Sequence, residues 1–357
     1  MIYPRVKRAG FSLLCMACLF IGCRSGPSMT EEPAAEEEAE IETDREDELP
    51  EHAVITADPA NLPPSSFGEI WGYVVAGREQ SLAGDMPLSD VGYFGAEVDG
   101  YGRLTDVPRR NRLADFSGRV HLVVTCPGYG LSHFVLTEGG ARRRLISELV
   151  DAARPYDGLQ IDFENVLKQD GEHFASFLEE LRRDLGDKIF SIAISARYRK
   201  IAPDPYDYER IAPLMDRVLV MAYDEHWSAS APGPVASMDW CKSVAAYSLK
   251  VIGPKKLIMG IPFYGRAWID PSPAGAKIFT ATERIIRENR IAEIRRENGV
   301  PVFTYEVPVQ VTLYYEDDYS LLTRMEMYRA MGIGAVGFWR IGQESPTVWN
   351  YLSISEN

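Results

Sequence analysis

Acidic residues interrupt an otherwise apolar stretch, YDGLQIDFENV, at residues 156–166. In a strand, successive side chains point to opposite faces. One face of this stretch would then be apolar and would pack against helices. The other face would carry a polar row that points inward, made of Gln160, Asp162 and Glu164. Acids at such positions need a chemical reason, because burying a charge is costly.

Asp162 and Glu164 are two residues apart, so their carboxyl groups would repel each other in a confined site and the pKa of one would be raised. A Glu164 side chain that keeps its proton for this reason can act as a general acid. The row has two other interpretations. It could bind a divalent cation, or it could satisfy buried hydrogen-bond donors without doing chemistry. The spacing by itself does not decide among the three.

Eight apolar or β-branched runs recur along the chain, often followed by a loop and a helical pattern. They cover residues 69–76, 91–98, 119–126, 158–164, 189–196, 217–224, 257–265 and 334–342. Continuous apolar runs suit parallel strands that helices cover. Alternating strand and helix signals predict an α/β fold with a parallel sheet, and eight strands predict a closed (β/α)8 TIM barrel. The polar row would then lie toward the carboxyl end of the fourth strand, where barrel enzymes keep their active sites.

One connection is longer than the others. Residues 269–317 follow the seventh strand and combine a helical pattern at 281–298 with strand-like pieces at 301–307 and 309–315. This composition predicts a small α+β insertion after strand seven. A loop in that position lies on the carboxyl face of a barrel, beside the predicted site.

The amino-terminal region has two parts that differ from the barrel. Residues 1–23 have a basic start, a short apolar run and then Cys23, which is the pattern of an export signal. The stretch FIGC resembles the lipobox of bacterial lipoproteins, which implies cleavage before Cys23 and lipidation of its sulfur. The alternatives are an ordinary signal peptide and an uncleaved anchor. Residues 24–60 are rich in Glu, Ala and Pro, with little to bury, and are predicted to be an acidic disordered tether that leads to a barrel at 61–357.

The charge of the chain belongs mostly to that tether. The net charge is −14 overall, with +3 in residues 1–23 and −11 in residues 24–58, which leaves −6 for residues 59–357. The predicted barrel therefore has no basic excess suited to nucleic acid. Only Cys126 and Cys241 lie in the predicted barrel, and they either pair or are small buried residues. The predicted barrel has no CxxC motif, the sequence has no HExxH motif and its histidines do not cluster, so neither a metal nor a cofactor is expected.

The stretch DGLQIDFE resembles the strand-four signature of glycoside hydrolase family 18, the chitinase family, which reads Asp-Gly-x-Asp-x-Asp-x-Glu. It matches at Asp157, Gly158, Asp162 and Glu164 and departs at Gln160. Other family patterns follow in order: YFGAEVDGYG at 93–102, VMAYDEHW at 220–227, GIPFYGRAW at 260–268 and GFWRIG at 337–342. The amide at position 160 together with YDEHW is most similar to the branch of spore-cortex-lytic N-acetylglucosaminidases and related bacterial envelope proteins.

The resemblance implies a retaining hydrolysis in which the 2-acetamido group of the substrate is the nucleophile. Glu164 would be the general acid and base, Asp162 would stabilise the oxazolinium ion, and Tyr223 would orient the acetamido oxygen. Asp157, as part of the signature, is counted with this catalytic set. The residues expected to bind substrate are Gln160, Met221, Asp224, Trp339, Tyr93, Trp71, Glu225, Tyr264 and Arg266. Trp227 and Trp268 are further aromatic candidates, each of which could instead be packing, and Asp318 is interpreted as solvent-facing.

Gln160 is the departure with chemical consequences. A glutamine cannot titrate, but it can donate a hydrogen bond to Asp162 and favour the ionised form of that acid. It also removes one negative charge from the row. The sequence thus predicts hydrolysis that is slower or shifted in pH, not a lost activity.

Two functions remain in competition. The first is a glycosidase that cleaves N-acetylglucosamine-containing glycans, either peptidoglycan strands or chitin oligomers, and the second is a lectin-like envelope protein that binds such glycans without cleaving them. The presence of Glu164, Asp162 and Tyr223 favours the enzyme. A cation-binding barrel would leave Tyr223 and Trp339 unexplained. Export and a lipid anchor at Cys23 predict a protein of the cell envelope, held at a bacterial membrane on its periplasmic or outer side, with peptidoglycan as the favoured substrate. The protein is expected to be a monomer.

Overall fold

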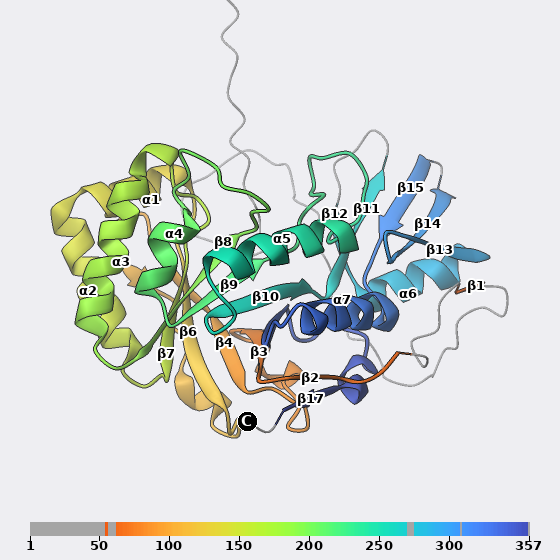
Figure 1. The fold of residues 1–357 in the computed structure, drawn as a ribbon, viewed down its shortest axis with the longest axis horizontal. Coiled ribbons are helices and arrows are strands. Elements are labelled where there is room, and N and C mark those ends of the chain that lie inside the picture. The colour runs from red at the N-terminus through yellow and green to blue at the C-terminus, as the bar shows by residue number, and fades with distance from the viewer. Residues whose placement is uncertain (1–53, 56–61, 270–274, 308, 356–357) are drawn as a thin grey trace, which may run out of the picture. The chain divides into compact units, whose positions relative to one another are not determined.

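The computed structural model describes residues 54–55, 62–269, 275–307 and 309–355 (Figure 1). The chain divides into two units, Met1–Glu48 and Leu49–Asn357. The predicted signal peptide, its cysteine at position 23 and nearly all of the predicted tether lie outside the described residues. All of the structure that follows belongs to the second unit.

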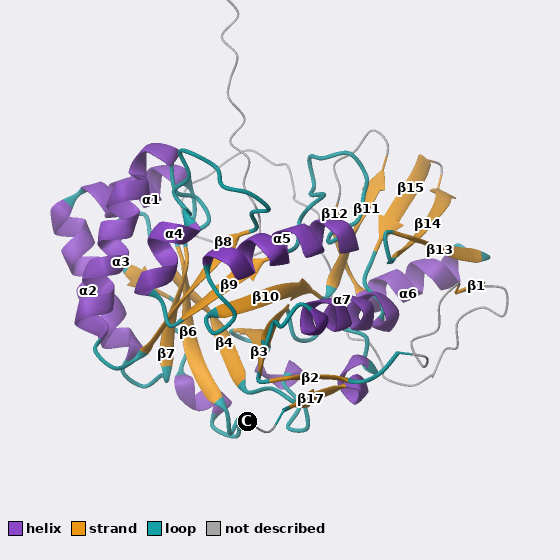
Figure 2. Ribbon diagram, in the orientation of Figure 1, coloured by secondary structure: helices purple, strands orange, loops and turns teal. Residues whose placement is uncertain are grey.

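The central sheet of that unit is a closed barrel of eight parallel strands, which confirms the predicted α/β barrel (Figure 2). Its strands are β3 (Glu69–Val75), β4 (Asp90–Val98), β6 (Arg119–Thr125), β7 (Gly158–Asp162), β8 (Ile189–Ser195), β9 (Arg217–Met221), β10 (Leu257–Pro262) and β16 (Ala335–Trp339). Neighbours pair in chain order, and β16 closes the ring by pairing with β3. All eight predicted runs are strands, although four of them end before the predicted residue by more than one position.

The outer wall of the barrel is helical on part of its circumference only. The helices are α1 (Tyr129–Thr137), α2 (Gly139–Ala153), α3 (Gly171–Leu185), α4 (Tyr208–Ile211), α5 (Met238–Val251) and α7 (Asp318–Ala330). The connections after β3 and β4 contain no α-helix, and the second of them holds the short strand β5 (Leu104–Thr105), which pairs with β4. No helix among the described residues combines the length and apolarity needed to cross a membrane.

The outward side chains of the strands and the inward side chains of the helices form the main apolar core. In α3, for example, Phe174, Phe177 and Leu181 recur at helical spacing and are fully buried. Cys126 and Cys241 are both buried and unpaired, so the interpretation of these cysteines as small buried residues is confirmed.

The insertion after the seventh barrel strand forms a second sheet with its own core, at the opposite end of the view from α1 and α2 (Figure 1). Its antiparallel strands are β11 (Tyr264–Ile269), β12 (Gly275–Ile278), β13 (Glu293–Glu297), β14 (Val300–Val307) and β15 (Val309–Tyr314), and its helix is α6 (Phe279–Glu288). The α+β character is as predicted, but the insertion begins at Tyr264, five residues early. The predicted helix at 281–298 is wrong beyond Glu288, because Arg290 has a positive φ of 51° and the chain then turns into β13.

Both ends of the second unit are attached by parallel pairing. Strand β1 (Val54–Ile55) adds to the edge of the insertion sheet beside β13, although residues 54–55 fall within the predicted disordered tether. Strand β2 (Ser65–Phe67) pairs with β17 (Leu352–Ile354), which brings the start and the end of this unit together. The prediction for residues 24–60 came from the average composition of the whole segment. An average of this kind gives no sign that two of the residues pair with β13.

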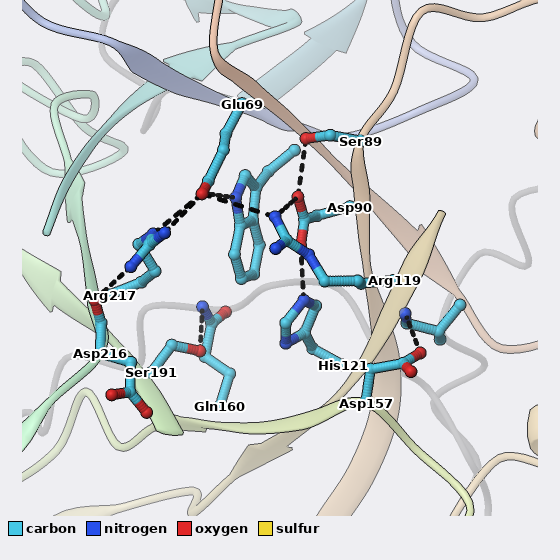
Figure 3. Close-up of polar contacts among 12 residues, drawn as sticks. Glu69, Ser89, Asp90, Arg119, His121, Asp157, Gln160, Ser191, Asp216 and Arg217 are labelled. Carbon is cyan, nitrogen blue, oxygen red and sulfur yellow. Dashed lines mark hydrogen bonds and ion pairs between the residues drawn. The ribbon is translucent and has the colours of Figure 1, made fainter. Parts of the chain in front are cut away.

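The amino end of the barrel is closed by charged residues at the starts of the strands (Figure 3). Glu69 pairs with Arg217, while Arg119 donates to both carboxylate oxygens of Asp90 at 2.7 and 2.8 Å. His121 contacts the same Asp90 through Nε2, also at 2.8 Å. These contacts pair the charged groups of the cluster with one another, while Nδ1 of His121 has no hydrogen-bond partner among the described residues.

Candidate active site

The carboxyl group of Asp162 lies inside the barrel at the end of β7, with 7% of the residue exposed. Its Oδ1 atom is buried and has no hydrogen-bond partner among the described residues. Burial raises the pKa of Asp162 well above its ordinary range, and the negative charge of Glu164 raises it further. The predicted repulsion within the acidic pair is therefore present, and it raises the pKa of Asp162.

Gln160 occupies the inward row as predicted but does not bond to Asp162. It is completely buried; its Oε1 accepts a hydrogen bond from the Tyr73 hydroxyl at 2.6 Å, and its Nε2 donates to Ser191 Oγ at 3.2 Å. The prediction that Gln160 favours an ionised Asp162 by donating to it is wrong, because the hydrogen bond from Nε2 goes to Ser191 and Oδ1 of Asp162 has no partner among the described residues. Tyr73 and Ser191 were not predicted, although alternation along the runs 69–76 and 189–196 places them on the inward face.

Glu164 lies two residues beyond the end of β7, so the predicted strand at 158–164 is two residues too long. The pairing of β7 with β8 stops at Ile161, and that with β6 stops at Asp162. Glu164 is half-buried and belongs to the loop at the carboxyl mouth of the barrel. Its carboxyl group is close enough for its charge to act on Asp162.

Tyr223 is positioned by the loop that follows β9. Burial raises the pKa of its hydroxyl, and the charges of Asp162 and Glu164 contribute in the same direction, so these three side chains share one site. Gly260 on β10 makes room for the ring, since a Cβ there would lie 3.0 Å from Cε1 of Tyr223. The ring meets that of Tyr264 edge to face, with 6.2 Å between centroids.

Asp224 is held in a left-handed backbone conformation with φ of 59°, which directs its side chain toward the insertion. Its Oδ1 atom accepts from the Tyr264 hydroxyl at 2.6 Å and from Nε and one terminal nitrogen of Arg266 at 3.1 and 2.6 Å. The predicted binding residues at positions 224, 264 and 266 therefore form one cluster. This cluster joins the strand-six loop to the first strand of the insertion.

Trp339 ends β16 and faces into the barrel. Its ring meets Phe94 edge to face at 4.9 Å and lies 5.7 Å from the ring of Tyr73. Tyr73 also bonds to Gln160, so this one tyrosine connects Trp339, the apolar floor of the site, with the polar row of β7. Phe94 was not predicted, but it is the neighbour of Tyr93 and therefore points to the opposite face.

Three residues of the predicted site lie elsewhere. Asp157 precedes β7 at the opposite end from Asp162; its carboxylate accepts from the backbone N–H of Val120 at 2.8 Å (Figure 3). Trp71 is fully buried near the amino end of the barrel, where it stacks on His121 with 4.2 Å between centroids. Tyr93 points outward from β4 and donates from its hydroxyl to Glu79. These three predictions are wrong. A residue reaches the site only if it lies at the carboxyl end of its strand and on the inward face, and closeness to a motif in the sequence ensures neither.

The remaining candidates have structural partners. Glu225 accepts from the backbone N–H of Ser237 at 2.9 Å, which shapes the loop after β9, and Met221 packs inside the barrel. Trp227 is half-buried in the same loop. Trp268 is buried in the insertion beside Tyr314. Asp318, predicted to face solvent, is 8% exposed and accepts from the Thr347 hydroxyl at the start of α7.

The site thus combines a proton-holding acid at Asp162, a second acid at Glu164, a hydroxyl donor at Tyr223 and an apolar floor at Trp339. Such a set can accept an N–H group, donate a proton to an oxygen and orient a carbonyl. The single negative charge left on two carboxyl groups that share one proton also suits a reaction in which positive charge develops on a sugar.

A comparison with protein-family models gives a match to "Glycosyl hydrolases family 18" over residues 105–344. The chain belongs to glycosyl hydrolases family 18. Membership confirms the predicted family and, with it, the predicted class of enzyme, a glycosidase.

Similar proteins include two from Bacillus subtilis (strain 168). The "Putative sporulation-specific glycosylase YdhD" is 31% identical over 222 residues, covering 58% of this chain and 53% of that protein. The "Uncharacterized glycosylase YvbX" is 30% identical over 236 residues, covering 62% of this chain and 68% of that protein. This family 18 chain therefore spans between about half and two thirds of the length of these relatives.

The barrel and its insertion also have a close counterpart among solved structures. The spore cortex-lytic enzyme SleL of Bacillus cereus superposes with a TM-score of 0.73 at 22% identity, covering 82% of this chain and 76% of that chain. At this identity, the likeness supports the fold of the family 18 domain.

Proposed function

We propose that this protein is a retaining, substrate-assisted glycoside hydrolase that cleaves β-1,4 bonds in N-acetylglucosamine-containing glycans. One observation carries the proposal. Asp162 has a buried carboxyl oxygen with no hydrogen-bond partner among the described residues, and it shares a site with Glu164 and Tyr223. A buried polar atom without a partner is costly, and an acetamido N–H would satisfy it.

In the proposed first step, Glu164 donates its proton to the glycosidic oxygen as the bond from that oxygen to the anomeric carbon breaks. The acetamido oxygen of the same sugar attacks the anomeric carbon from the other side and forms an oxazolinium ion. Tyr223 donates to that oxygen and keeps it in line, which removes much of the entropic cost of the attack. The Asp162–Glu164 pair carries one shared proton, which lies on Glu164 in the substrate complex. The ionised Asp162 accepts from the acetamido N–H and stabilises the positive ring.

In the second step, Glu164 takes a proton from water while the water oxygen attacks the anomeric carbon. The oxazolinium ring opens, the acetamido group is restored, and the sugar keeps its original configuration. Trp339 supplies the apolar surface under the ring. No protein nucleophile and no cofactor is used in this scheme.

We favour peptidoglycan or its fragments as the substrate. Support comes from the names of similar proteins, which include a sporulation-specific glycosylase and a spore cortex-lytic enzyme. Lipidation at Cys23, proposed from the sequence FIGC, would hold the barrel next to the wall of the cell that makes it. In the same proposal the protein acts as a monomer in the cell envelope.

The test uses the native protein and Glu164→Gln with two substrates, N-acetylglucosamine oligomers and purified peptidoglycan. The native protein should release reducing ends from at least one, and the first-formed anomer, followed by NMR, should be β. Glu164→Gln should lower kcat by roughly 10²–10⁴-fold, the usual range for loss of a general acid. A thiazoline analogue of the oxazolinium ion should inhibit the native protein.

The competing function is glycan binding without cleavage. Measurable binding of both glycans by the native protein, with no turnover of either, would establish a lectin and refute the hydrolase. An α anomer as first product would refute the retaining mechanism but not the glycosidase.

A further inference from the structure

The loop that carries Glu164 has little backbone support of its own. It begins where β7 ends at Asp162, and residues 163–167 form neither helix nor strand. In this loop the carbonyl of Phe163 and the N–H of Val166 flank Glu164 and Asn165. Both groups are buried, so each needs a hydrogen-bond partner.

One side chain supplies both partners. The hydroxyl of Tyr206, from the segment between β8 and α4, donates to the Phe163 carbonyl at 2.7 Å and accepts from the Val166 N–H at 3.0 Å. A single oxygen atom thereby closes the loop on both sides of Glu164 and takes the place of a sheet neighbour.

Tyr206 is itself held rigidly. The residue is 5% exposed, and its ring meets Phe174 of α3 edge to face at 5.9 Å. Its backbone N–H donates to Asp204, which also accepts two hydrogen bonds from Arg197 at 2.6 and 3.0 Å. Burial also raises the pKa of Tyr206, so the hydroxyl keeps its proton and remains a donor across the working pH range.

We propose that Tyr206 is a positioning residue for the general acid: its hydroxyl fixes the backbone on both sides of Glu164 and so sets where the Glu164 carboxyl meets the glycosidic oxygen. This inference rests on the proposed function. Tyr206 contacts the backbone of the loop and is 5% exposed, so we expect it to act on the rate of proton donation and not on the binding of glycan.

The loss of rate expected from removing the Tyr206 hydroxyl follows from the geometry of the loop. Displacing a catalytic group by about 1 Å can cost on the order of 10²-fold in rate. Tyr206→Phe keeps the ring and its packing but leaves the Phe163 carbonyl and the Val166 N–H without their partner. We expect kcat to fall about 10- to 100-fold while KM changes less than about 2-fold.

The test compares Tyr206→Phe with Tyr208→Phe. Tyr208 is also buried, and its hydroxyl donates to the Ser195 carbonyl at 2.8 Å instead of to the Glu164 loop. Both variants lose one buried tyrosine hydroxyl bonded to a backbone carbonyl, so both should lose thermal stability. Tyr206→Phe should lose more, because it also leaves the Val166 N–H without its partner. Only Tyr206→Phe should lose kcat beyond that seen in the control.

A second readout separates proton donation from general damage. The two variants and the native protein are assayed with an N-acetylglucosamine oligomer and with a dinitrophenyl glycoside, whose leaving group needs no proton. If Tyr206 positions the acid, the loss in kcat/KM for Tyr206→Phe should be at least about 5-fold smaller with the dinitrophenyl substrate.

Equal losses on both substrates, or equal losses in the two variants, would overturn the inference while leaving the hydrolase intact. Absence of turnover by the native protein would instead refute the proposed function. In that case hydrogen exchange still tests the contact: Tyr206→Phe must speed exchange of the Val166 amide, and unchanged exchange would overturn the positioning role by itself.

Discussion

The substitution Gln160→Glu tests how the inward row controls protonation. It keeps the length and shape of the side chain. Tyr73 already donates to Oε1 at 2.6 Å, and the Ser191 hydroxyl, 3.2 Å from Nε2, can turn its proton toward the second oxygen. Two hydrogen bonds to a charged group contribute about 1.5–3 kcal/mol each, which offsets much of the cost of burying a carboxylate there.

The effect on Asp162 follows from its distance along β7. Residues two apart in a strand are separated by roughly 6.6 Å. Two negative charges at that distance repel each other by about 2.5 kcal/mol at an effective dielectric constant of about 20. At 1.36 kcal/mol for each pKa unit, the pKa of Asp162, which burial has already raised, should rise by a further ~1.8.

The assay is the pH dependence of kcat/KM on an N-acetylglucosamine oligomer. The basic limb reports loss of the last proton from the Asp162–Glu164 pair, so Gln160→Glu should move this limb upward by one to two pH units, as roughly expected from the ~1.8 above. Gln160→Met is the matched control, because it removes both hydrogen bonds without adding charge. Gln160→Met should lower the stability of the protein and the rate of hydrolysis, but both limbs of the pH profile should stay where they are in the native protein. A Gln160→Glu profile within about 0.3 pH units of the native one, in a folded protein, would refute the reasoning.

Two further substitutions test the stability of the site. The folded-state pKa of Asp162 is raised, so its contribution to stability is present at low pH and is lost as the pH rises above the ordinary range of an aspartate. Asp162→Asn should therefore raise the free energy of unfolding at pH 7 by about 1.4 kcal/mol for each pKa unit of the elevation, and the Tm with it. This gain should vanish near pH 3, and a Tm gain that does not depend on pH would contradict the assignment. Asp224 has a φ of 59°, which Asn tolerates and Ala does not, so Asp224→Ala should be less stable than Asp224→Asn by about 1 kcal/mol in urea unfolding, and equal stabilities would contradict the strain argument.

The barrel could be predicted from the sequence because its signal is repeated eight times. Each strand has an apolar outward face that must pack on helices, and this periodicity is local. The inward row at Gln160 and Asp162 followed from the same alternation. The insertion was located by the length of its connection, but its helix was extended too far because the apolar spacing continues past Arg290, where the backbone turns.

The errors share a physical origin. Asp157, Trp71 and Tyr93 lie close to motif residues in sequence, yet a barrel has two ends and each strand two faces. The partners of Gln160 could not be read from one strand, because they come from β3 and β8. Tyr206 was missed for the same reason: it lies 40 residues after Val166, in no motif, and only the folded chain brings its hydroxyl to the loop.

The packing at the start of β7 has a consequence for how the substrate range of this protein can change. A Cβ at Gly158 would lie 2.3 Å from Nδ1 of His121, so this position accepts no side chain unless the charged cluster at the amino end of the barrel moves. The other end of the same strand is tied through the Glu164 loop to Tyr206. A strand fixed at both ends cannot slide or tilt to suit a new glycan. New specificities, whether natural or engineered, must therefore come from the rim loops and the insertion, and libraries that vary those segments while sparing residues 158–166 should keep the largest share of active members.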